Sequence, residues 1–178
     1  MPQQSELISD DYRKLNASLH HEREGWGTTG QQWGKLVLNF AKELNTTDIL
    51  DYGCGKGSLS QVLPFPIHQY DPAIAQHSAL PQPAKMVVCL DVLEHIEPDR
   101  IDAVLDHLRD LVKTCGFFVI HLQPALNFLP DGRNAHVLQR PPRWWFRRLL
   151  DRFEILQSRV AQPHLIVLVE PRVPGLEE

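Results

Sequence analysis

Residues 48–57 read Asp-Ile-Leu-Asp-Tyr-Gly-Cys-Gly-Lys-Gly, a short apolar run that ends in an acid and continues into a glycine-rich turn. This pattern predicts a strand whose end meets a ligand, because glycine lets the backbone approach a bound molecule where a Cβ would collide. The glycines at 53, 55 and 57 close too early for the dinucleotide fingerprint Gly-x-Gly-x-x-Gly. Lys56 is followed by Gly57, so the turn is not a phosphate loop either.

Two further acids follow predicted strands. Asp71 comes 20 residues after Asp51 and precedes Pro72. This spacing is expected when a second parallel strand places a carboxylate beside the first loop, where it can accept hydrogen bonds from the two hydroxyls of a ribose. A turn formed by Asp71-Pro72 is the alternative. Asp91 follows the apolar run 86–90, at the end of a strand where open α/β sheets bind their ligands.

Three segments together resemble the class I S-adenosylmethionine-dependent methyltransferases. Ile49–Gly57 resembles the first motif of that family, Gln69-Tyr-Asp71-Pro the second, and Val87–His95 the strand and loop that close the cofactor pocket. The resemblance implies a Rossmann-like, doubly wound α/β fold, with S-adenosylmethionine as cofactor and S-adenosylhomocysteine as product. The implied cofactor-binding residues are Asp51, Tyr52, Gly53, Cys54, Gly55, Asp71, Pro72, Leu90, Asp91 and Val92.

Catalytic and substrate-binding residues are predicted around a loop that follows the strand at 117–122. His136 is the first choice for a general base, because imidazole titrates near neutral pH, and Glu94, His95 and His20 are second choices. Glu94 and His95 could instead orient their own loop. The predicted substrate contacts are Trp26, His20, Arg133 and Asn134. Alternatively, Trp26 is an apolar plug, Asn134 caps a turn and His136 lies on the surface.

We expect no metal site. His20 and His21 are followed by Glu22 and Glu24, but neighbouring side chains diverge and no further ligand is spaced to join them. The three cysteines, Cys54, Cys89 and Cys115, are predicted to be reduced.

Apolar periodicity and turn residues predict alternating helices and strands in one domain over residues 1–178, with flexible ends at 1–10 and 172–178. The segment 11–44 is expected to supply a lid and packing helices. Only fourteen residues, 72–85, separate two strands, so we expect a compact sheet that lacks one strand-helix unit there. The family resemblance implies that the last strand runs antiparallel. His121 is expected to lie in the core with its hydrogen bonds satisfied.

Helices are expected at 11–20, 31–44, 58–63, 100–114 and from the prolines at 141–142 to 150, and strands at 48–51, 67–70, 86–90, 117–122, 153–160 and 164–169.

The overall composition limits the classes of partner. The chain has 178 residues, 43% of them hydrophobic, and a net charge of −4, which makes a general nucleic-acid binder unlikely. The polar start and the absence of a signal-peptide pattern predict a cytoplasmic protein. The Trp- and Arg-rich stretch 140–148 could hold an anionic acceptor, contact a membrane surface or stack nucleic-acid bases, or simply pack on the sheet.

The acceptor is expected to be a small molecule or a saccharide or lipid-linked hydroxyl, methylated on oxygen or nitrogen. The alternatives are a catalytically inactive S-adenosylmethionine-binding sensor or scaffold, and a nicotinamide oxidoreductase, which the glycine spacing disfavours.

Overall fold

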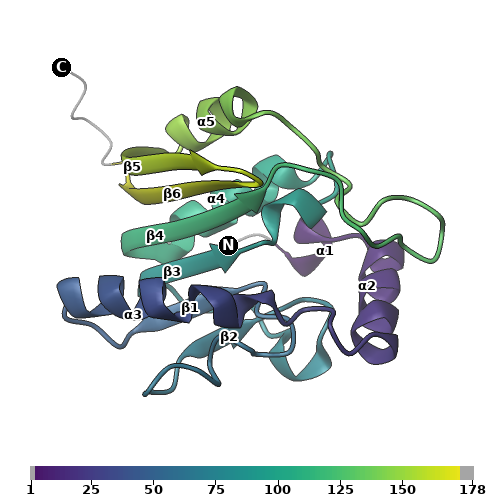
Figure 1. The fold of residues 1–178 in the computed structure, drawn as a ribbon, viewed down its shortest axis with the longest axis horizontal. Helices are drawn as coiled ribbons and strands as arrows, with labels where there is room; N and C mark the ends of the chain where they lie inside the picture. The colour runs from purple at the N-terminus through teal and green to yellow at the C-terminus, as the bar shows by residue number, and fades with distance from the viewer. Residues whose placement is uncertain (1–2, 173–178) are drawn as a thin grey trace.

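A computed structural model describes residues 3–172 and contains one six-stranded sheet (Figure 1). The strand order is β2-β1-β3-β4-β6-β5; β1 to β4 pair in parallel, and β6 runs antiparallel to both β4 and β5. This confirms the predicted fold class, including the antiparallel last strand. The strands are β1 (Ile49–Tyr52), β2 (His68–Tyr70), β3 (Ala84–Leu90), β4 (Val112–His121), β5 (Phe153–Ala161) and β6 (His164–Pro171).

Helices cover both faces of the sheet because its central strands are apolar on both sides. In Figure 1, α3 lies in front of the strands and α4 behind them. Neighbouring residues on β4 point to opposite faces: Phe117 packs in the core on the α3 side, whereas Phe118 packs with Trp145 on the side of α4 and α5. The helices are α1 (Gln4–Leu7), α2 (Asp10–Glu22), α3 (Gly34–Glu43), α4 (Ile101–Leu111) and α5 (Pro142–Leu150), with short 3₁₀ turns η1 (Thr29–Trp33), η2 (Ala75–His77) and η3 (Leu93–His95).

Across residues 3–172, no helix combines the length and apolarity that spanning a bilayer requires.

The sheet is compact at the β2 edge. Between β2 and β3 the chain forms only η2, which confirms the predicted loss of one strand-helix unit. The helix predicted at 58–63 is wrong, since this segment consists of turns. Gly57 has a φ of +71°, and Pro64 ends the segment. The six residues between them are too few to offset the free-energy cost of starting a helix.

The boundary between α4 and β4 also differs from the prediction. The helix ends at Leu111 and β4 begins at Val112, whereas the apolar stripe had predicted a helix to residue 114 that Gly116 would end. Gly116 lies inside β4, where a Cβ would come within 2.7 Å of both Phe118 and Val169. The predicted helix at 31–44 begins as η1, and Leu36 on its α-helical part is 41% exposed.

The N-terminal segment is fastened to the loop after β3. Leu7 is buried, and Glu97 accepts hydrogen bonds from the backbone N–H of Ser9 at 2.8 Å and from its hydroxyl at 2.6 Å. Residues 3–10 therefore have defined contacts with the domain, while the flexibility predicted for residues 1–10 stays a prediction. For residues 1–2 and 173–178 it lies outside the described part of the chain.

Candidate active site

A cavity of about 660 Å³ opens at the carboxyl ends of β1, β3 and β4 and is covered by α2. Its size is within the range of about 300–1,000 Å³ that is usual for small-molecule sites. All ten residues predicted to bind the cofactor line it, and so do His20, Trp26, Glu94, His95 and His136. The sequence motifs that end β1, β2 and β3 therefore meet at one cavity.

The glycine turn is shaped by neighbouring loops of the protein. A Cβ on Gly53 would lie 2.4 Å from Val92, and one on Gly55 would lie 2.6 Å from the carbonyl oxygen of Gly27. Both glycines also have positive φ, +79° and +52°, which other residues rarely adopt. Close approach of the chain to itself thus explains these glycines, where the sequence had suggested close approach to a ligand.

Two acids define one end of the cavity. Asp71 accepts hydrogen bonds from the backbone N–H of Gly55 at 3.0 Å and of Ala73 at 2.9 Å, and its side chain is turned toward the glycine loop. Asp51 is 3% exposed, and its burial, together with the nearby charge of Asp71, raises its pKa to about 7. No lysine or arginine among the described residues lines the cavity. This end therefore suits a ligand with a positive charge and hydroxyl donors, as the ammonium and ribose of S-adenosylmethionine would supply.

Two of the predicted cofactor residues already have partners within the protein. Asp91, with φ of +55°, accepts hydrogen bonds from Gln32 Nε2 and Trp33 Nε1, both at 3.2 Å, and so ties η1 to the end of β3. The Tyr52 hydroxyl lies 3.1 Å from Nδ1 of His107 in the core. Both residues line the cavity, but their polar atoms also serve the fold.

His95, His121, His136 and His164 cluster in another part of the cavity, called here the histidine end. Histidines and acids also meet, since Nε2 of His20 lies 4.0 Å from Asp71 and Nε2 of His164 lies 3.4 Å from Asp91. The His136 ring lies 4.7 Å from the rings of both His95 and His121, and His121 lies 5.0 Å from His164. Burial lowers the pKa of His20, His95, His136 and His164, so these imidazoles are neutral near pH 7.

His121 and His164 are residues that the sequence did not assign to the site. His121 was expected in the core, yet it lines the cavity. The two residues are directly opposite each other on β4 and β6. The sequence could not show this pair, because it depends on the antiparallel register of the two strands.

Helix α2 and the loop that follows it form the lid, and they place His20 and Trp26 in the cavity lining. The ring of Trp26 lies edge-on to His95 at 5.3 Å and to His20 at 6.4 Å. On α2, the hydroxyl of Tyr12 donates a hydrogen bond to the carbonyl oxygen of His95 at 2.7 Å. In Figure 1, α2 and the loop between β4 and α5 lie together at one end of the sheet, joined by contacts of Tyr12 and Leu19 with Leu129.

Arg133 and Asn134 lie outside the cavity lining, contrary to their predicted contact with substrate. Arg133 pairs with Asp131 at 2.6 Å and lies over the Tyr12 ring, and the amide of Asn134 bonds to both backbone groups of Ala125. These contacts hold the loop itself.

The residues of the stretch 140–148 are not among those that line the cavity either. Trp145 is buried, and Trp144 stacks with Arg148 at 3.7 Å, while Arg148 pairs with Asp102 on α4. Packing on the sheet therefore accounts for the two tryptophans, and the suggestion that these arginines hold the acceptor is not supported. Contact with a membrane surface stays a prediction.

A family model described as a methyltransferase domain matches residues 19–159 of this chain. The chain belongs to this methyltransferase family. Membership confirms the class I S-adenosylmethionine-dependent methyltransferase resemblance and, with it, the enzyme class and the cofactor.

Solved methyltransferase structures share the fold. A 1,6-didemethyltoxoflavin-N1-methyltransferase from Burkholderia thailandensis superposes with a TM-score of 0.64 at 16% identity, over 96% of this chain and 92% of that one. The magnesium protoporphyrin IX methyltransferase from Synechocystis PCC 6803, with S-adenosylmethionine bound, gives 0.60 at 17% identity, over 97% and 99%. The N-methyltransferase NodS from Bradyrhizobium japonicum WM9 gives 0.62 at 10% identity, over 91% and 99%. No curated protein sequence matches the methyltransferase.

Proposed function

We propose that this methyltransferase transfers a methyl group to a hydroxyl of a small molecule bound at the histidine end of the cavity. The observation that carries the proposal is the pair of neutral imidazoles, His95 and His136, in the cavity lining, because a hydroxyl must lose its proton to become a good nucleophile. Similar folds act on small molecules, among them the methyltransferases of a porphyrin and of didemethyltoxoflavin. A cytoplasmic location remains part of the proposal.

The acidic end would hold the cofactor. When bound, S-adenosylmethionine supplies a methyl group made electrophilic by its positively charged sulfur. Asp71 would accept hydrogen bonds from the ribose hydroxyls, and ionised Asp51 would face the positive charge of the methionine portion. Leu90 and Val92 would supply apolar walls to the cavity. Alignment of the two reactants then supplies a large part of the acceleration.

His136 is the proposed general base. Its Nδ1 lies against the carbonyl oxygen of Gln123, which can only accept, so Nδ1 carries the hydrogen and Nε2 keeps its lone pair. Nε2 would take the hydroxyl proton as the acceptor oxygen forms its bond to the methyl carbon. Glu94, His95 and His20 remain second choices for the same task, and Trp26 would cover the acceptor.

The test is formation of S-adenosylhomocysteine by the full chain with matched panels of small hydroxyl, amine and thiol compounds. We expect turnover with hydroxyl compounds, and we expect His136→Ala to slow it by about 100-fold or more, as removal of a general base does, while cofactor binding is kept. Turnover of amines alone would contradict the proposal. Cofactor binding without any turnover would favour the sensor or scaffold alternative, and full activity of His136→Ala would remove this residue from the mechanism.

A further inference from the structure

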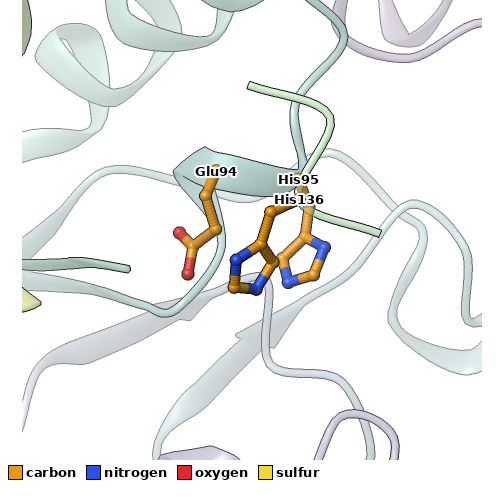
Figure 2. A group of neighbouring side chains, drawn as sticks. All are labelled: Glu94, His95 and His136. Atoms are coloured by element: carbon orange, nitrogen blue, oxygen red, sulfur yellow. The ribbon is translucent and has the colours of Figure 1, made fainter. Parts of the chain in front are cut away.

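Glu94, His95 and His136 meet in the wall of the cavity (Figure 2). One potential metal-ligating atom from each residue lies within 4.8 Å of those of the other two. Glu94 and His95 come from η3, directly after β3, and His136 comes from the loop between β4 and α5. Because the third residue is far away in the sequence, no linear spacing of ligands could reveal the group.

Both imidazoles have the tautomer that metal-binding histidines need. Nδ1 of His95 lies 2.8 Å from the carbonyl oxygen of Ala135, and Nδ1 of His136 contacts that of Gln123. A carbonyl oxygen can only accept, so each Nδ1 carries the hydrogen and each Nε2 keeps a free lone pair. A histidine that binds a metal usually donates its other N–H to such an oxygen, which fixes the ring orientation and raises the basicity of the ligand nitrogen.

The carboxylate of Glu94 is buried with half of its hydrogen-bonding capacity unused. The side chain is fully buried, Oε1 accepts from the backbone N–H of His121 at 3.1 Å, and Oε2 has no partner among the described residues. An unpaired buried carboxylate oxygen is costly.

The surroundings supply no other positive charge. Five acids line the cavity, and no lysine or arginine among the described residues does. Of these acids, Glu97 is engaged by Ser9 and Arg100, whereas Glu94 has no cationic partner within residues 3–172. A bound cation would therefore give Oε2 of Glu94 a partner and would offset part of the negative charge of the cavity acids.

We propose that Glu94, His95 and His136 bind one divalent transition-metal cation of the Zn²⁺ and Co²⁺ type, with its remaining positions open to the cavity. Two imidazoles and one carboxylate are a donor set that suits such cations and leaves a position for water or substrate. With bonds of about 2.0–2.2 Å, tetrahedral ligands lie roughly 3.3–3.6 Å apart, so the three side chains would close by about 1 Å on binding. This revises the sequence-based expectation of no metal.

The binding of the cation does not depend on the proposed function. A role of the cation in catalysis does rest on that function. An acceptor hydroxyl at the open position would be held and its pKa lowered by the cation. His136 would then be a ligand and no longer a free base, so the two roles exclude each other in one molecule. Turnover distinguishes them, since only the ligand role makes activity depend on the metal.

The test is titration of the chelator-treated full chain with Co²⁺, followed by visible absorption, with displacement by Zn²⁺ and elemental analysis for stoichiometry. We expect one Co²⁺ per chain with the intense bands of a four- or five-coordinate site. Glu94→Gln keeps an oxygen acceptor for the His121 N–H and removes the charge, so it should weaken binding by at least about 100-fold without unfolding the protein. His136→Gln should do the same.

His68→Ala is the matched control, because the His68 side chain is 73% exposed and lies outside the cavity. It should leave Co²⁺ binding unchanged, and calorimetry with S-adenosylhomocysteine checks that each variant is folded. The inference is overturned if no stoichiometric Co²⁺ binds, or if Glu94→Gln binds it as tightly as the unaltered chain. Binding of Co²⁺ without hydroxyl methylation would leave the site standing and contradict the proposed function alone.

Discussion

Asp51 is buried, although its proposed role beside a positively charged ligand requires the ionised form. Its pKa of about 7, raised first by burial and then by Asp71, means that a proton must leave before the cation of the cofactor can pair with it. Since the ionised form binds, affinity should rise as the pH rises through this pKa.

We predict that affinity for S-adenosylhomocysteine, which keeps the methionine ammonium, increases about tenfold from pH 6 to pH 8. The ionised fraction of Asp51 rises over that interval from about one-tenth to about nine-tenths, given a pKa of about 7. Calorimetry across the pH range measures the change. Asp51→Asn should bind weakly at every pH and show a flat profile; an equally steep profile in this variant would assign the titration to another group.

Position 53 requires glycine for two reasons, its positive φ and the closeness of Val92. Gly53→Ala should cost about 1–3 kcal/mol from strain at positive φ alone, with more from collision with Val92, and should weaken cofactor binding. Urea unfolding measures the stability. Adding Val92→Ala should recover the collision part but not the strain, so a double variant as stable as Val92→Ala alone would show that φ does not matter here.

At the scale of elements, the lid depends on a few directed contacts between α2 and the loop after β3. Tyr12→Phe keeps the ring but removes the hydrogen bond to the carbonyl oxygen of His95, worth about 1 kcal/mol. We predict faster hydrogen exchange in α2 and little change in β3 or β4. Arg13→Ala is the control, because the one ion pair of the Arg13 side chain with the described residues is a surface pair with Asp10 on the same helix. Uniformly faster exchange throughout the protein would mean that α2 is not a separate lid.

The scale of the whole molecule shows which features a sequence can reveal. That Asp51 and Asp71 meet in one cavity was predictable, because a strand and the turn after it are local and their spacing indicates neighbouring strand ends. His121 and His164 meet only through the register of β6 on β4, and His136 joins Glu94 only through a long loop. Arg133 was misassigned because its charge, without the fold, does not reveal that Asp131 and Tyr12 already engage it.

The cavity that we propose for the cofactor is lined by several of these distant segments, so filling it should stabilise the protein as a unit. At a ligand concentration of 100 times Kd, binding to the native state alone adds about 2.7 kcal/mol. For a chain of this size, that corresponds to a rise in Tm of about 5–11 °C. Thermal unfolding with S-adenosylhomocysteine measures it, and Asp71→Asn should lose most of the shift if Asp71 makes the proposed contact with the ribose. NADH should give no shift; a shift with NADH and none with S-adenosylhomocysteine would contradict the assignment of the cavity, whatever the acceptor proves to be.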